Sequence, residues 1–341
     1  QARRLSMVSR AYHTDRLGPL ARRLCELTGA ERMLPMNTGV EAVETALKAA
    51  RKWAYQVKGV PDGHAVIVAC EGNFHGRTIT AVGMSGEPQY RAGFGPFAPG
   101  FVRIPYGDAA ALKAAITDCT AAFLVEPIQG EGGIIVPPKG YLAACAAICR
   151  ERNVLLICDE VQTGLGRTGR MLACEHDRVA PDGIVLGKAL GGGLIPVSAF
   201  LARAEVMDVF TPGDHGSTFG GNPLACAVAL EALDLLEEER LIEQAATLGD
   251  YMLRGLRALR SPLIRTVRGK GLLAGIELDI SLASAREVCE AMLRRGVLTK
   301  DTHRSVLRFA PPLVISPAQL DDAMVRIGRA LNDVMRQIDR E

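Results

Sequence analysis

Short apolar runs alternate with longer amphipathic segments through the first two-thirds of the chain. The short runs are partly β-branched and end at glycine, proline or a charged residue, which is typical of buried strands. They span Ala65–Cys70, Ala121–Glu126, Val154–Asp159, Gly183–Gly187 and Val197–Leu201. The longer segments have helical spacing, as in the stripe formed by Tyr141, Leu142, Cys145, Ile148 and Cys149. This alternation predicts an α/β fold with a mainly parallel central sheet flanked by helices.

The pattern changes in the last third of the chain. A helix is expected after Asn222-Pro223, where an N-cap residue precedes a proline at the first helical position, and a second helix follows it. A strand at 272–278, a helix at 286–295, a strand at 306–310 and a final helix from Ser316 then predict a smaller α+β unit. We therefore expect a large domain over residues 1–245 and a small one over 246–341, since a chain of this length typically has about two domains.

The composition gives no reason to expect nucleic acid or a membrane as a partner. Lys plus Arg number 40 and Asp plus Glu 38, so the formal net charge is only +2. An uncharged stretch near the middle, Gly191 to Ala202, is too short to span a bilayer. These features are typical of a soluble globular protein.

The cysteines indicate the cellular compartment of the protein, and the first residues indicate how the chain begins. The nine cysteines form no CxxC pair, and no histidines accompany them at metal-ligand spacing. We therefore expect buried thiols in a cytoplasmic protein, with neither a metal site nor a disulfide framework. The chain starts at Gln1 inside a helix-like pattern, without an initiator methionine or an apolar signal region, so we expect further residues upstream.

Charged residues follow three of the predicted strands, where ligands of open α/β sheets gather. They are Glu126, Asp159 and Lys188. An acid in such a place can also be a helix cap or a surface charge. Lys188, however, lies between an apolar strand and a glycine run, where partial desolvation would lower its pKa and make the amine a nucleophile towards an aldehyde. Pyridoxal phosphate (PLP) needs such a lysine and a carboxylate at its pyridinium nitrogen, for which Asp159 is the candidate.

A phosphate cradle is predicted at 37–41. Thr38 and Glu41 have capping-box spacing, and helical periodicity follows them. Gly39 would let a phosphate approach the free N–H groups at the positive end of the helix dipole. Such a sequence is also an ordinary helix start. The hydroxyls of Ser217 and Thr218, on a glycine-rich turn, offer a second phosphate contact.

The segment Gly164–Gly169 matches the GxGxxG fingerprint of dinucleotide-binding folds. Three residues separate it from the end of the preceding strand, and no apolar-periodic helix opens after it. Because the fingerprint needs both elements, the match favours a nicotinamide-dependent oxidoreductase only weakly.

Several blocks of the sequence resemble those of the class III aminotransferases, which are fold-type I PLP enzymes. They occur in the family's order and cover nearly the whole chain, so jointly they are specific. The blocks are Asn73–Thr78, Glu126–Glu131, Asp159–Gly164, Leu186–Lys188 and His215–Asn222. The resemblance implies a large PLP-binding α/β domain, a smaller C-terminal α+β domain and amino-group transfer.

For the cofactor, the resemblance implies that Lys188 forms the Schiff base and shuttles protons, while Asp159 pairs with the pyridinium nitrogen. Gln162 would hydrogen-bond the ring hydroxyl, and Phe74 would stack on the ring face. Gly39 and Val40 would give backbone N–H groups to the phosphate. Thr218 would reach the phosphate of the partner subunit, so the family pattern implies a homodimer.

Three further blocks, at 34–42, 93–97 and 307–313, are most similar to those of family members that use ornithine with 2-oxoglutarate. By this resemblance Arg77 would bind the α-carboxylate of ornithine and Arg308 that of 2-oxoglutarate, each by bidentate pairing. Glu131 would neutralise Arg308 while ornithine reacts and then swing away. Glu126 would be a nearby carboxylate.

Other interpretations stay open at this point. Phe74 could be plain core, the arginines could form surface ion pairs, and His75 is expected to be a packed or capping histidine rather than a catalyst. The donor could instead be acetylornithine or 4-aminobutyrate, because aromatic pocket residues that help to select it belong to a family segment expected upstream of Gln1. A PLP-fold binding protein without activity is disfavoured, since it would not need both Lys188 and Asp159.

Overall fold

The computed structural model describes residues 1–303 and 305–340. The chain forms two compact units, of which the first comprises Gln1–Pro127, Pro137–Leu165 and Met171–Glu238. The second comprises Ile128–Val136, Gly166–Arg170 and Glu239–Glu341. Its main segment begins before the predicted boundary at 245/246, because the helix that this boundary would divide belongs wholly to the second unit. Position 341, where the predicted small domain ends, lies outside the described residues.

The first unit is built on a seven-stranded sheet in the order β1-β7-β6-β5-β4-β2-β3. Strands β3, β2, β4, β5 and β6 run parallel, β7 is antiparallel to β6, and β1 is antiparallel to β7. The mainly parallel sheet expected from the sequence is thus confirmed. The strands are β1 (Arg32–Met36), β2 (Val66–Cys70), β3 (Phe101–Ile104), β4 (Thr120–Val125), β5 (Leu155–Asp159), β6 (Gly183–Leu186) and β7 (Ser198–Ala202).

The two strands that the sequence did not predict, β1 and β3, are the edges of this sheet. Pro35 lies inside β1, and Val102 and Arg103 of β3 are exposed. Edge strands carry proline and charge because one side of each makes no ladder hydrogen bonds. They therefore lack the continuous apolar pattern that identified the buried strands β4 to β7, all of whose residues are buried.

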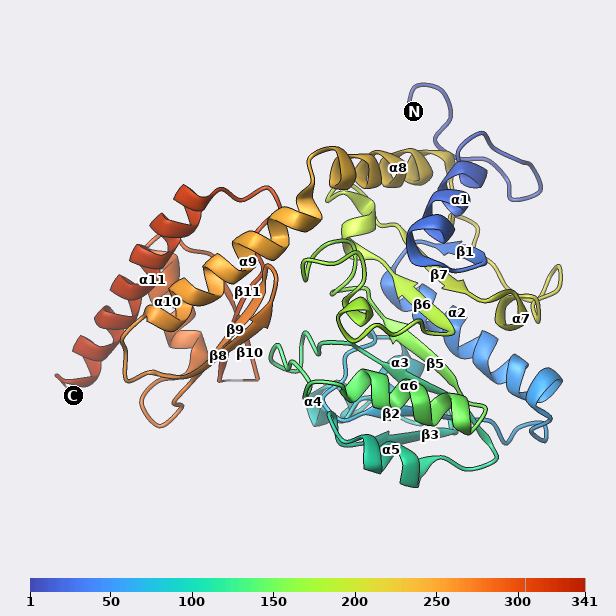
Figure 1. Ribbon diagram of the computed structural model, residues 1–341, viewed down its shortest axis with the longest axis horizontal. Helices are drawn as coiled ribbons and strands as arrows, with labels where there is room; N and C mark the ends of the chain where they lie inside the picture. Colours follow the sequence, from blue (N-terminus) through green and yellow to red (C-terminus); the bar gives the residue numbers. More distant parts are fainter. Residues whose placement is uncertain (304, 341) are drawn as a thin grey trace. The chain divides into compact units, whose positions relative to one another are not determined.

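Helices cover the sheet, with α6 in front of it and α2 behind it in Figure 1. The buried face of α2 is rich in alanine, which lets the helix approach the strands closely. This face, including Trp53 at the end of the helix, packs with Ile67 and Phe200 in the main core. The helices of this unit are α1 (Leu17–Thr28), α2 (Gly39–Trp53), α3 (Ile79–Met84), α4 (Pro88–Arg91), α5 (Ala109–Ala115), α6 (Tyr141–Glu151), α7 (Ala204–Met207) and α8 (Pro223–Glu238). Short π- or 3₁₀-helical turns occupy η1 (Ala54–Lys58), η2 (Ala173–Asp177) and η3 (Lys188–Gly191).

The second unit holds a four-stranded antiparallel sheet in the order β10-β11-β9-β8. Capping boxes at Ser284 and Ser316 begin two of its helices, as the pattern at Ser316 predicted. The apolar faces of the helices and the sheet form a core of their own. The elements are α9 (Leu241–Ala258), β8 (Ile264–Lys270), β9 (Leu273–Leu278), α10 (Ala285–Arg294), β10 (Lys300–Thr302), β11 (Val306–Phe309) and α11 (Pro317–Ile338).

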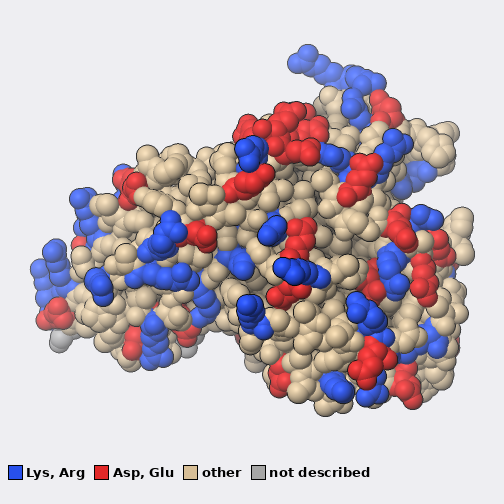
Figure 2. Space-filling model, in the orientation of Figure 1, with Lys and Arg blue, Asp and Glu red and all other residues tan. Residues whose placement is uncertain are grey.

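Charges of both signs are spread over the surface seen in Figure 2, and most of the thiols are buried. Figure 2 shows basic and acidic side chains interspersed over most of the visible face. All nine cysteines are free thiols, and seven of them are buried. Within residues 1–303 and 305–340, none of the helices has the length and apolar character that a bilayer crossing requires.

Candidate active site

A cavity of about 180 Å³ opens in the first unit where β4, β5 and β6 end. Because these three strands are neighbours in the sheet, they bring Glu126, Asp159 and Lys188 to one place, as the sequence predicted. The lining residues are Gly39, Val40, Val43, Phe74, His75, Gly76, Glu126, Asp159, Val161, Gln162, Thr163 and Lys188. A nucleophilic amine and two carboxylates therefore share one cavity.

The Asp159 carboxylate is held by two hydrogen bonds. Its Oδ2 lies 2.7 Å from Nδ1 of His75, and its Oδ1 accepts from the backbone N–H of Val161 at 3.1 Å. The His75 side chain is fully buried, and its Nε2 has no hydrogen-bond partner among the described residues. Burial favours neutral His75, but the hydrogen bond with Asp159 and the charges of Asp159 and Glu126 outweigh it and raise the pKa of His75. A protonated His75 would keep Asp159 ionised, which suits a partner of a protonated ring nitrogen.

Lys188 enters the cavity from a strained turn. Its φ of 42° lies in the left-handed region, which is uncommon for a residue other than glycine and clusters at functional sites. The lysine directly follows β6 and begins the short turn η3. In the single chain its side chain is exposed, so the partial desolvation expected from the sequence is not observed. The reason is that the turn points the residue out of the buried strand and into the open cavity.

The first turn of α2 has the features of an anion site. Glu41 accepts hydrogen bonds from N of Thr38 at 2.6 Å and N of Asn37 at 3.1 Å, which completes the capping box. Although burial favours the neutral acid, these hydrogen bonds lower the pKa of Glu41. The N–H groups of Gly39 and Val40 make no hydrogen bond with any described residue. They are therefore left for an anion at the positive end of the helix dipole.

Two glycines keep this part of the cavity open. A Cβ on Gly39 would come within 2.9 Å of Val161, and one on Gly76 within 2.3 Å of Val40. Gly76 also has a φ of +133°, which side chains rarely allow. The free N–H groups, the lysine and the histidine-held carboxylate together match the phosphate, the aldehyde and the ring nitrogen of PLP. The residues present thus fit this cofactor.

The two predicted hydroxyl residues lie outside the lining of the cavity. Ser217 accepts hydrogen bonds from Nδ2 of Asn37 at 2.9 Å and from N of Gly220 at 3.0 Å, so its turn is tied to the start of α2. Thr218 is exposed. Within one chain, these hydroxyls therefore do not border the cavity that the start of α2 lines.

Arg77 is also exposed, next to the cavity rather than in its lining. Its guanidinium carbon lies 4.0 Å from the ring centroid of Tyr90 and 5.2 Å from that of Phe74. The two rings meet edge to face, with centroids 5.9 Å apart and planes at 79°. Within the described part of the chain, no hydrogen bond or ion pair engages the guanidinium, so its donors remain available.

The second unit contains Arg308 and Glu131, which the family resemblance predicts to be an ion pair. Arg308 on β11 forms an ion pair with Glu131, and Lys300 on β10 lies 3.2 Å from the same carboxylate. The side chains of Arg308 and Glu131 are only 18% and 17% exposed, so water screens the pair weakly. Burial acts against the charge of Glu131, but the hydrogen bonds and charges of Arg308 and Lys300 prevail and lower its pKa.

The loop that carries Glu131 is fixed to its own unit. Arg268 on β8 donates from Nε to the carbonyls of Gly133 and Ile134, each at 3.0 Å. Ile134 is fully buried and belongs to a small cluster with Leu273. Glu131 is therefore placed by neighbouring loop residues that are held firmly.

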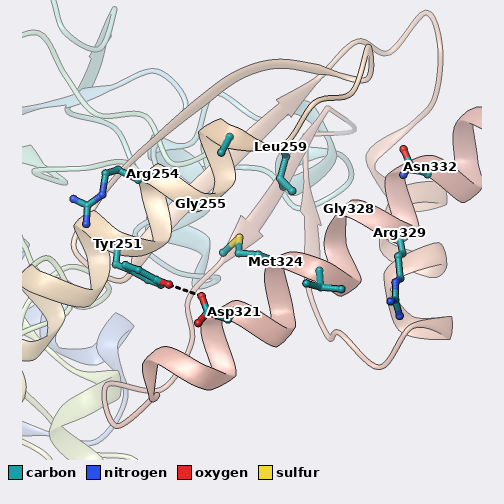
Figure 3. A pocket seen from close by; sticks show the side chains of 11 residues that line it. Tyr251, Arg254, Gly255, Leu259, Asp321, Met324, Gly328, Arg329 and Asn332 are labelled. Carbon is teal, nitrogen blue, oxygen red and sulfur yellow. Dashed lines mark hydrogen bonds between the residues drawn. The ribbon is translucent and has the colours of Figure 1, made fainter.

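A larger groove of about 700 Å³ lies within the second unit, along α9 and α11. Tyr251 and Asp321 on its wall hydrogen-bond to each other, as Figure 3 shows, and Met324 and Leu259 supply an apolar surface. None of the residues proposed from the sequence lines this groove. The catalytic chemistry is therefore assigned to the cavity of the first unit.

The structure also shows what the sequence did not. The contact of His75 with Asp159 and that of Tyr90 with Arg77 were not predicted. His75 is buried, as expected of a packed histidine, but nothing in the local sequence links it to an aspartate 84 residues away. The GxGxxG match leads into turns and then into the short 3₁₀ helix η2, so no helix of a dinucleotide-binding fold follows it.

The fold and the cavity define an enzyme that uses PLP to process an amine. The family model described as aminotransferase class-III matches residues 1–331, and the chain belongs to this family. It is thus a PLP-dependent aminotransferase. Family membership also excludes the nicotinamide-dependent oxidoreductase.

More specific similarity is to enzymes named ornithine aminotransferase. The one from Bacillus subtilis (strain 168) is 55% identical over 333 residues, which cover 98% of this chain and 82% of that protein. A structure of the one from Toxoplasma gondii, with partial occupancy of PLP at its active site, has a TM-score of 0.97 at 49% identity and covers 99% of this chain and 80% of that one. The acetylornithine aminotransferase of Elizabethkingia anophelis has a TM-score of 0.87 at 45% identity, with 98% and 82% covered.

Proposed function

We propose that the chain is an ornithine δ-aminotransferase, which moves the δ-amino group of L-ornithine to 2-oxoglutarate and yields glutamate-5-semialdehyde and glutamate. The observation that carries this proposal is the contrast between two arginines. Arg77 has no acidic partner among the described residues, whereas Arg308 is paired with Glu131. Relatives named ornithine aminotransferase, at 53% to 55% identity, support it.

The two substrates differ in charge, since ornithine has one carboxylate and 2-oxoglutarate has two. An enzyme that binds them in turn needs a second cation for the oxo acid and must hide that cation from the donor. We assign the α-carboxylate of ornithine to Arg77 and that of 2-oxoglutarate to Arg308. Glu131 neutralises Arg308 while ornithine reacts and moves away when the oxo acid arrives.

When bound, PLP supplies an aldehyde carbon that takes up the amino group and a ring that withdraws electrons from the neighbouring C–H bond. We assign Asp159, held by His75, to the ring nitrogen and Gln162 to the ring hydroxyl. Phe74, which lines the cavity, would pack against the ring face. The N–H groups at the start of α2, where Thr38 is the N-cap, bind the phosphate.

Lys188 is assigned as the amine that holds the cofactor and as the base that moves a proton at Nζ. Glu126 serves this arrangement indirectly, because its Oε2 accepts the backbone N–H of Phe74 at 3.0 Å and fixes the start of that loop. The reaction is a ping-pong cycle in which the semialdehyde leaves before 2-oxoglutarate binds.

We further infer a cytoplasmic homodimer in which Thr218, with Ser217, contacts the phosphate in the partner's cavity. The support is that Thr218 is exposed and outside the lining of its own cavity. Phe219 and Leu194 are 61% and 77% exposed, and we infer that the partner subunit covers them.

The test is a panel of amino donors with 2-oxoglutarate and the purified holoenzyme. L-ornithine should have the highest kcat/KM, and glutamate-5-semialdehyde should form in step with glutamate. Acetylornithine and 4-aminobutyrate are the competing donors. A higher kcat/KM for either of them would refute the ornithine assignment while leaving the aminotransferase class in place.

A further inference from the structure

Arg77 packs against two aromatic rings and has no acidic partner in residues 1–303 and 305–340. Its guanidinium lies in the corner between the rings of Tyr90 and Phe74, closer to Tyr90. A cation within about 6 Å of a ring centroid is attracted to the negative face of the ring. This contact leaves the N–H groups of the guanidinium unused, whereas a carboxylate partner would occupy them and would compete with a ligand.

Tyr90 belongs to a short helix that is anchored on both sides. Glu87 caps α4 through the N–H of Gln89 at 3.3 Å, and Pro88 occupies its first turn. Arg91, the next residue, donates to the carbonyls of Val82 and Ser85 at the end of α3, each at 3.3 Å, and to that of Gly83. Its guanidinium also covers the ring of Phe97 at 4.5 Å. The ring of Tyr90 is therefore offered to Arg77 by a segment whose backbone is held in place.

The other wall of the corner belongs to the cavity. Phe74 lines the cavity, and its backbone N–H donates to Glu126. A guanidinium that rests on both rings is consequently at a set position relative to the reacting atoms. A carboxylate that binds its free edge then has a set distance to the amine that reacts, which is the condition for near-attack geometry.

We propose that Tyr90 is a positioning residue that holds Arg77 ready for the carboxylate of the amino donor. This rests on the proposed function for two points, the assignment of the donor carboxylate to Arg77 and the name of the donor. We call the two rings of Tyr90 and Phe74 that enclose the guanidinium the cage. The cage acts on any ligand whose carboxylate reaches Arg77, and it has no effect on an amine without a carboxylate. Loss of the aromatic face lets the guanidinium sample other rotamers, so affinity for the carboxylate falls while the chemistry of bound substrate is retained.

The first experiment compares wild type, Tyr90→Leu and Tyr90→Phe holoenzymes. Tyr90→Leu should raise KM for ornithine by roughly 3- to 10-fold with a smaller change in kcat, and Tyr90→Phe should restore it, since the ring face is enough. KM for 1,4-diaminobutane, which is ornithine without its carboxylate, should not rise. Tyr12→Leu is the matched control, because Tyr12 is 70% exposed and outside the cavity.

The second experiment measures binding without turnover. Pentanoate, which has the carboxylate but no amine, is titrated calorimetrically into holoenzymes with phenylalanine, difluorophenylalanine or trifluorophenylalanine at position 90. Each fluorine weakens the negative ring face and hardly changes its shape, so the Kd of pentanoate should rise step by step. An unchanged Kd across the series would overturn the cage.

The two proposals can fail separately. If the Kd of pentanoate rises along the fluorinated series at position 90 but wild type does not use ornithine, the ornithine assignment falls and the cage stands. If wild type uses ornithine and Tyr90→Leu raises KM equally for ornithine and 1,4-diaminobutane, the cage falls and the ornithine assignment stands.

Discussion

Each of the two units of this enzyme contains one of the arginines that we propose as carboxylate ligands, and the two side chains are held by opposite means. In the first unit, Arg77 lies exposed against aromatic rings, and no residue that the structure describes uses its donors. In the second, Arg308 is mostly buried and paired with Glu131, with Lys300 on the same acid. The first arginine is thus always available, whereas the second must be released before it can bind a ligand.

The difference follows from what surrounds each side chain. An exposed guanidinium on an aromatic face keeps its charge and its hydration, so a ligand has little to displace. Arg308 and Glu131 have given up most of their water, and each would be costly to leave unpaired. A ligand carboxylate that takes the place of Glu131 keeps Arg308 paired. The buried arrangement is therefore suited to an exchange of one carboxylate for another.

The largest effect is expected when each arginine is removed in turn. Arg308→Ala should lower kcat/KM for 2-oxoglutarate by roughly 30- to 1000-fold, since loss of a buried charge partner costs about 2–4 kcal/mol. The half-reaction with ornithine should change far less. Arg77→Ala should show the reverse. Single-turnover spectra of each half-reaction measure both, and Lys188→Ala is the control that stops both.

Equal losses of both half-reactions in Arg308→Ala and in Arg77→Ala would contradict the division of labour between the two arginines. In that event the pair Arg308–Glu131 would be structural, and the contrast between the units would have no catalytic meaning.

A smaller effect is expected when Glu131, the gate that neutralises Arg308, loses its charge while Arg308 is left unchanged. Glu131→Gln keeps the shape of the side chain but removes the charge that neutralises Arg308. Dicarboxylic amino acids should then compete better as donors, so the ratio of kcat/KM for ornithine to that for glutamate should fall by about tenfold. Glu243→Gln is the matched control, since Glu243 forms an exposed pair with Arg240 in the same unit and does not contact the Glu131 loop. An unchanged ratio in Glu131→Gln would show that Glu131 does not gate.

How far the sequence predicts these features depends on the distance along the chain over which each is encoded. Asp159 and Lys188 were found because each directly follows its own apolar strand, and parallel neighbours bring such ends together. The cap at Thr38 is encoded within four residues. The edge strands β1 and β3 have no periodic pattern, so the sheet was predicted without its edges. The short loops that belong to the second unit have no such pattern either, so the domain boundary was placed at a single point.

Contacts between distant side chains have no local pattern at all. Glu131 and Arg308 are 177 residues apart, and their relation entered only through the family resemblance. The contact of His75 with Asp159 could not be predicted, because a buried histidine beside phenylalanine and glycine is equally typical of a core. Tyr90 was missed because its helix spans only four residues and has no periodicity to mark which side faces Arg77.

The smallest effect is a pH dependence of the free energy of unfolding. It is expected for the buried pair of Arg308 with Glu131 and not for Arg77, which has no acidic partner among the described residues. The pKa of Glu131 is lowered from the ordinary value of 4.5, so its ion pair stabilises the fold above pH 4.5 and this contribution is lost as the pH falls through the lowered value. Wild type should therefore be more stable than Glu131→Gln at pH 7, by about 1 kcal/mol, and the difference should vanish well below pH 4.5. Thermal unfolding of the holoenzymes measures this difference.

Glu243→Gln breaks an exposed pair with Arg240 in the same unit and should show almost no difference at either pH. A difference for Glu131→Gln that persists in acid would mean that packing rather than charge holds the Glu131 side chain, and the gate would then have to be a movement of Arg308.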